Sequence, residues 1–78
     1  MKSMAEKPLD LIHSSLEKTV LVEVRGNRVF RGILKGYDQH LNLVISETEE
    51  LSDDEVFRRL GYIVIRGANV VYVAPRSL

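Results

Sequence analysis

The chain has 78 residues, which predicts a single small domain with a limited core, a kind of domain that oligomerisation often stabilises. It has no cysteine, which excludes disulfides and thiolate metal sites. It also shows neither the apolar core of a signal peptide nor an apolar run of transmembrane length. We therefore expect a soluble protein of the cytoplasm.

The charges are balanced in number but not in position. There are 11 basic and 11 acidic side chains, which argues against binding duplex DNA through a broad basic face. One short stretch holds six of the acids: Glu47, Glu49, Glu50, Asp53, Asp54 and Glu55. We expect this stretch to be a solvated loop. The rest of the chain has 11 basic and 5 acidic side chains, so a neutral total can hide a local positive site.

The first predicted element is a short helix from about Pro8 to Glu17, preceded by a polar tail over residues 1–7. Proline suits the first helical turn, because its missing N–H would lack a partner there in any case. Leu9, Ile12 and Leu16 recur at helical spacing and form one apolar stripe.

Alternating apolar residues after the helix predict five short strands. We place them at Val20–Arg25, Arg28–Tyr37, Leu41–Ser46, Val56–Ile65 and Asn69–Ala74, all within one domain over residues 8–75 and before a tail over 76–78. Gly32 and Gly36 share one face of the second strand, which indicates a sharp bend or a close approach of another backbone. One helix followed by five such strands predicts a mainly β fold, a strongly bent antiparallel sheet that forms a small open barrel.

The last two strands are apolar on both faces, as Tyr62–Ile65 and Val70–Val73 show. One face of a small antiparallel sheet is usually wet, so these strands need cover that one short helix cannot supply. A neighbouring copy would supply it, and pairing between two different edges generates a ring or a filament. The alternative is that both strands are central in a compact monomer.

Two groups of residues resemble the motifs of the Sm-like (Lsm) family, and its archaeal members in particular. The first motif is matched by Gly26, Phe30, Gly32, Leu34, Tyr37, Asp38, Leu41 and Asn42, and the second by Ile65-Arg66-Gly67 and Asn69–Val73. The resemblance implies a helix that caps a bent five-stranded barrel. It also implies a homo-oligomeric ring, heptameric in similar proteins, in which the fourth strand of one subunit pairs with the fifth strand of the next.

The resemblance further implies a pore site for short, uridine-rich single-stranded RNA. His40 and Arg66 would sandwich a base, since an imidazole and a guanidinium both stack on nucleobases. Asn42 would read the uracil edge through its amide donor and acceptor. Asp38 would orient the loop, and Gly67 would allow a close backbone approach. Taken singly, each residue could instead serve only a turn or a strand edge.

A second RNA patch is conceivable on the helix side of the ring, formed by Lys7, His13 and Tyr37. There Tyr37 could instead pack against the helix, with His13 facing water. Function as a protein-assembly scaffold with no RNA role is the main alternative to RNA binding. We expect no enzymatic activity, no cofactor and no metal, because no nucleophile is paired with a base and no third metal ligand stands near Asp38 and His40.

Overall fold

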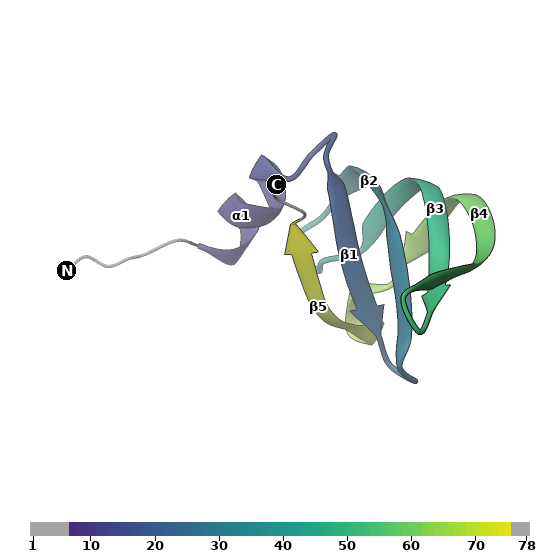
Figure 1. The fold of residues 1–78 in the computed structure, drawn as a ribbon. Helices are drawn as coiled ribbons and strands as arrows, with labels where there is room; N and C mark the ends of the chain where they lie inside the picture. Colours follow the sequence, from purple (N-terminus) through teal and green to yellow (C-terminus); the bar gives the residue numbers. More distant parts are fainter. Residues whose placement is uncertain (1–6, 76–78) are drawn as a thin grey trace.

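The computed structural model describes residues 7–75 and confirms one helix followed by five antiparallel strands (Figure 1). The elements are α1 (Pro8–Ser14), β1 (Thr19–Val24), β2 (Arg28–Tyr37), β3 (Leu43–Ser52), β4 (Glu55–Ile65), a 3₁₀ turn η1 (Gly67–Asn69) and β5 (Val70–Pro75). The predicted tails, apart from Lys7, lie outside the described residues. The helix of the described region is far too short to cross a membrane.

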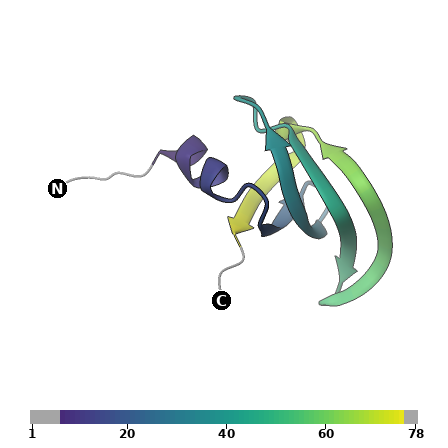
Figure 2. The same cartoon turned by 90° about the horizontal axis from the view of Figure 1, so that it is seen from above.

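The five strands form one sheet in the order β4-β3-β2-β1-β5, so β4 and β5 are its two edges. Figure 2 shows how strongly the sheet curls, with the long β3–β4 hairpin bent around one side. The inner face carries the core, which consists of Ile12, Val20, Val22, Val24, Phe30, Leu34, Leu43, Ile45 and Ile65. Alternate residues of β1 are buried, as the period of two predicted.

Gly32 is one of the two glycines of β2 that predicted a bend or a close approach, and it lies where the sheet bends. A Cβ atom on Gly32 would lie 2.5 Å from Ile45 Cγ2 and 2.7 Å from the carbonyl oxygen of Ser46. The pairing of β2 with β3 also shifts register between Arg31 and Ile33, so the bend and the close approach coincide. Gly36 has no such constraint, because a Cβ there would only reach Val44 at 4.0 Å.

The predicted loop at the acidic stretch is wrong, since β3 runs on to Ser52 and only Asp53 and Asp54 form the turn. Glu50 on the inner face accepts hydrogen bonds from Arg28 Nε at 2.8 Å and from Arg58 Nε at 2.9 Å. Glu49 on the opposite face pairs with Arg31 at 2.7 Å and Arg59 at 3.4 Å. These cross-strand pairs stabilise an acidic segment as a strand, an effect that composition alone does not reveal.

The other boundaries differ by smaller amounts. The helix ends at Ser14 rather than Glu17, because Ser15 and Leu16 continue as turns that lead to Glu17 in the left-handed region at φ 65°. Leu41 precedes β3 rather than beginning it, since it too has a positive φ, of 63°. Asn69 belongs to η1 rather than to β5.

The two arginines beside Glu50 should make the stability of the fold depend on pH. Hydrogen bonding to Arg28, joined by Arg58, lowers the pKa of the buried Glu50 carboxyl from 4.5 to about 2. Its stabilising effect is therefore complete above pH 4.5 and is lost as the pH falls towards 2. We expect Glu50→Gln to lower the free energy of unfolding by roughly 1.5–3 kcal/mol near neutral pH. We also expect the thermal unfolding midpoint of the variant to change less than that of the wild type between pH 4.5 and 2. Thermal melts at one fixed protein concentration measure both effects. An undiminished acid dependence in the variant would contradict this role of Glu50.

Candidate nucleic-acid interface

Two segments far apart in the chain are bonded together, the β2–β3 loop and the start of η1. The Gly67 backbone N–H donates to Asn42 Oδ1 at 2.7 Å. The backbones also touch, because a methyl group on Gly67 would overlap the carbonyl oxygen of His40. The close approach predicted for Gly67 is therefore found, and its φ lies outside the left-handed region. Arg66, which precedes Gly67, is thereby held next to the loop that carries His40.

Asp38 organises the β2–β3 loop from within. Its Oδ1 accepts from the backbone N–H of His40 at 2.8 Å and of Asn42 at 3.1 Å, and its Oδ2 accepts from Asn42 Nδ2 at 2.9 Å. The side-chain hydrogen bond from Asn42, helped by these backbone donors, lowers the pKa of Asp38. The carboxylate is thus directed at the loop, which fits the orienting role expected of it.

Asn42 has a structural role that sequence reasoning did not identify. Its amide joins Asp38 on one side to the Gly67 backbone on the other. One amide hydrogen and one lone pair of Oδ1 remain for a ligand, since the NH₂ group offers two donors and the carbonyl oxygen two lone pairs. No spacing in the chain would have indicated this link, because 25 residues separate Asn42 from Gly67.

His40 and Arg66 are exposed to solvent and stand on the two bonded segments. A flat imidazole and a flat guanidinium carried by neighbouring loops can contact two faces of one planar ring. The site therefore combines two exposed planar side chains with two segments that Asp38, Asn42 and Gly67 join by hydrogen bonds.

Two of the three residues of the second predicted patch, His13 and Tyr37, lie together. His13 Nδ1 lies 3.0 Å from the Tyr37 hydroxyl, and their rings meet edge to face with centroids 6.1 Å apart. Lys7 is exposed at the position just before α1. Tyr37 is the last residue of β2 and immediately precedes Asp38, so this pair lies one residue from the loop that carries His40.

The positive charge around the site is smaller than the sequence suggested. Four arginines, Arg28, Arg31, Arg58 and Arg59, pair with Glu49 or Glu50 within the sheet. The two carboxylates offset two of these four charges, so the excess of +6 outside the acidic stretch does not act as one field. Arg66 is a cation that adjoins the bonded loops. Among residues 7–75, no three His, Asp or Glu side chains gather as a metal site would require.

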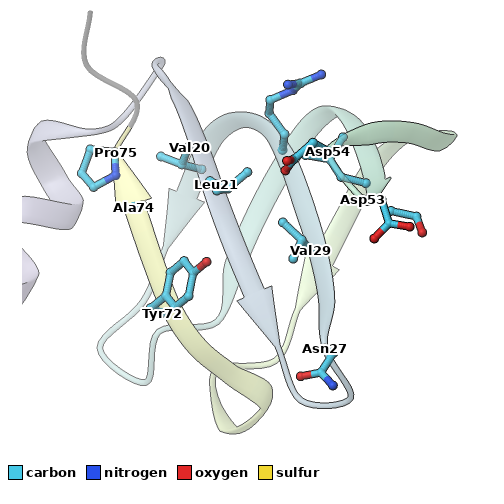
Figure 3. A pocket seen from close by; sticks show the side chains of 12 residues that line it. Val20, Leu21, Asn27, Val29, Asp53, Asp54, Tyr72, Ala74 and Pro75 are labelled. Atoms are coloured by element: carbon cyan, nitrogen blue, oxygen red, sulfur yellow. The ribbon is translucent and has the colours of Figure 1, made fainter.

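A groove of about 730 Å³ lies elsewhere, on the outer face of β1, β2 and β5 (Figure 3). Its walls include Leu21, Val29, Tyr72 and Ala74, with Asp53 and Asp54 at one end. None of the predicted RNA-binding residues lines it.

A helix followed by a curled five-stranded sheet, with two bonded loops that present a histidine and an arginine, defines a small Sm-type barrel domain. The LSM domain family model matches residues 10–75. An snRNP Sm-like protein of Methanococcoides burtonii is 53% identical over 72 residues, which cover 92% of this chain and 100% of the relative. The chain belongs to the LSM family, as its motifs indicated.

Solved structures agree with this assignment. The Pyrococcus abyssii Sm protein, solved in complex with a uridine heptamer, is 52% identical with a TM-score of 0.87, and the match covers 91% of this chain and 100% of that one. The P. aerophilum SmAP1 heptamer is 35% identical with a TM-score of 0.86, and the match covers 95% of this chain and 99% of that one.

Proposed function

We propose that this protein assembles into a ring of seven identical subunits and holds short, uridine-rich single-stranded RNA at the ring's pore, as a scaffold or chaperone in RNA processing. The observation that supports the proposal is the hydrogen bond between Asn42 and Gly67, which joins the loop that carries His40 to the segment that follows Arg66. A relative 52% identical was solved with a uridine heptamer, and a second relative was solved as a heptamer.

The two edges of the sheet support assembly. Tyr62 and Val64 on β4 are 69% and 67% exposed, and Val71 and Tyr72 on β5 are 57% and 45% exposed. Apolar edge strands with unpaired backbone groups are poor surfaces for a monomer and good templates for strand pairing. Because β4 and β5 are different edges, their pairing is heterologous and can close a ring.

A shallow groove beside the end of β4 would also be filled by such pairing. It has a volume of about 290 Å³ and includes Phe30, Leu60 and Val64 in its lining, with Arg66 and Asn69 at the rim. An apolar strand from another copy would cover this lining.

In the proposed site, one base stacks between His40 and Arg66 of each subunit while the free amide groups of Asn42 meet the uracil edge. Stacking contributes about 1–3 kcal/mol per base, so one subunit alone binds weakly. In a ring, every contact after the first is intramolecular, and overall affinity rises by roughly 10²–10⁴. Ring closure is therefore part of the binding mechanism.

Arg66→Ala should weaken oligouridine binding without breaking the ring, because Arg66 is exposed and lies outside both edge strands. Fluorescence anisotropy with labelled oligouridine measures the affinity, and light scattering measures the assembly. Arg59→Ala is the matched control. It removes an arginine of β4 that pairs with Glu49 of β3, and it should leave the oligouridine affinity nearly unchanged. Normal affinity in Arg66→Ala would count against the pore site.

Comparison of oligouridine with oligoadenine separates RNA recognition from a role as a protein-assembly scaffold. Preference for uridine supports the proposed site, whereas an intact ring that binds neither oligomer would favour the scaffold. The proposal places the protein in the cytoplasm and assigns it no catalysis. Nuclease activity that the pure protein retains, and that a chelator abolishes, would contradict that assignment.

His13 and Tyr37 support a second contact for RNA near the pore loops. Their rings already meet, and a base could stack on either of them. Photocrosslinking of RNA to His13 or Tyr37 would support this contact, and protection confined to the β2–β3 loop and η1 would remove it.

A further inference from the structure

The turn between β1 and β2 lies at the same end of the sheet as η1. Val24 at the end of β1 pairs with Arg28 on one side and with Val70, the first residue of β5, on the other. Beyond this row, the Arg25 backbone N–H donates to the carbonyl oxygen of Asn69 at 2.9 Å. The β1–β2 turn is therefore bonded to η1, the segment that directly follows the arginine of the pore site.

The same turn presents Arg25 to solvent. Gly26 and Asn27 have φ values of 87° and 62°, and two successive positive φ values are what the tightest hairpin turns require. Figure 3 shows Asn27 on this turn, at the end of the sheet where β5 begins. Arg25 is exposed, and among residues 7–75 no carboxylate forms an ion pair with it. Its guanidinium can therefore offer its N–H donors to a ligand.

Arg28, on the other side of the turn, adds positive charge. Its guanidinium and that of Arg58 share one carboxylate, Glu50, at 2.8 Å and 2.9 Å. Two cations beside one anion leave a net positive charge on this cluster. Arg28 donates to Glu50 through Nε and Nη2, so the donors of Nη1 remain for a ligand, and its side chain is 49% exposed.

The acidic turn between β3 and β4 lies beside a different groove. Asp53 and Asp54 line the groove on the outer face of β1, β2 and β5. Glu23, the acid of β1, alternates with buried residues and so faces outwards as well. Arg28 and Arg66 instead line the groove of about 290 Å³ beside the end of β4. These three acids therefore do not share the groove of the two arginines.

We propose that Arg25, with Arg28 beside it, binds the phosphates of the RNA strand whose bases stack at His40 and Arg66. The inference rests on the proposed pore site and extends it. The bonded loops take the bases, and the adjoining end of the sheet takes the charged backbone. Every nucleotide brings one phosphate, and every subunit of a ring brings one such pair of arginines, so the contact repeats along the strand.

Arg25→Ala should weaken oligouridine binding at low salt and reduce its dependence on salt. The affinity of a single strand falls with a logarithmic slope of about −0.7 for each phosphate that the protein neutralises, so each lost contact should flatten the slope by about 0.7. The preference for oligouridine over oligoadenine should remain, because phosphate contacts carry no sequence information. Fluorescence anisotropy at several salt concentrations measures both quantities. Arg25→Lys, which keeps the charge, should retain most of the wild-type slope.

Arg59→Ala is again the matched control, because it removes the same charge from an exposed position on β4. Its salt slope should equal that of the wild type if the effect of Arg25 is local rather than a general change in net charge. The backbone hydrogen bond from residue 25 to Asn69 is available to alanine as well, so the Arg25 variant should keep the turn in place.

Oligouridine with neutral methylphosphonate linkages tests the phosphate contact from the side of the RNA. The wild type should bind it less tightly than ordinary oligouridine, and Arg25→Ala should show a smaller difference between the two. An Arg25→Ala variant with the wild-type salt slope, alongside an Arg66→Ala variant that has lost affinity, would overturn the inference and leave the proposed pore site standing. A wild-type ring that binds no oligouridine at any salt concentration would overturn both.

Discussion

Val64→Lys should yield a folded subunit that no longer forms a ring. Val64 is 67% exposed near the end of edge strand β4, so a lysine is tolerated by the isolated subunit. In the proposed ring the same position faces the β5 strand of the next copy, where an unpaired charge opposes edge pairing. Loss of the ring removes multivalency, so we expect oligouridine affinity to fall by roughly 10²–10⁴.

Native mass spectrometry and circular dichroism distinguish loss of assembly from loss of folding in this variant. Val64→Thr is the matched control, because threonine keeps the branched shape and the strand preference without adding a charge. It should assemble like the wild type. A lysine variant that still forms a complete ring would show that β4 is not the edge through which subunits join.

Gly67→Ala should abolish most uridine binding while leaving the sheet folded. A methyl group there would overlap the carbonyl oxygen of His40, so the β2–β3 loop and η1 must separate. Separation breaks the 2.7 Å hydrogen bond to Asn42 and moves Arg66 away from His40. Loss of stacking costs about 1–3 kcal/mol per base and recurs at every subunit of the ring.

The control for this variant is Gly36→Ala in the preceding strand. A Cβ on Gly36 would meet Val44 only at 4.0 Å, an ordinary contact, so that variant should bind oligouridine normally. Affinity measured by anisotropy and assembly measured by light scattering should therefore separate the two glycines. Unchanged uridine affinity in Gly67→Ala would mean that the joined loops do not form the binding site.

The periodicity of the sequence predicted the fold well because burial follows it closely in the first strands. Val20, Val22 and Val24 face the core as the alternation in β1 required. The doubly apolar strands were correctly singled out, since they proved to be the two edges, β4 and β5. The prediction failed where partners distant in sequence decide local structure. Glu49 and Glu50 lie in a strand because arginines on β2 and β4 pair with them.

The site was predicted by the resemblance of its motifs rather than by spacing. In the structure a hydrogen bond joins the two segments, and the Asp38 carboxylate accepts hydrogen bonds from its own loop. It adds the link from Asn42 to Gly67, which depends on a three-dimensional approach that no local pattern encodes. The predicted roles of His40, Asn42 and Arg66 towards RNA remain predictions.

Native mass spectrometry of the wild-type chain, recorded with and without a short oligouridine, reports copy number and ligand in one spectrum. We predict a single closed species of seven subunits that gains the mass of one bound strand and gains none from oligoadenine. A folded single subunit at micromolar concentration, with no change in mass when oligouridine is added, would contradict the account.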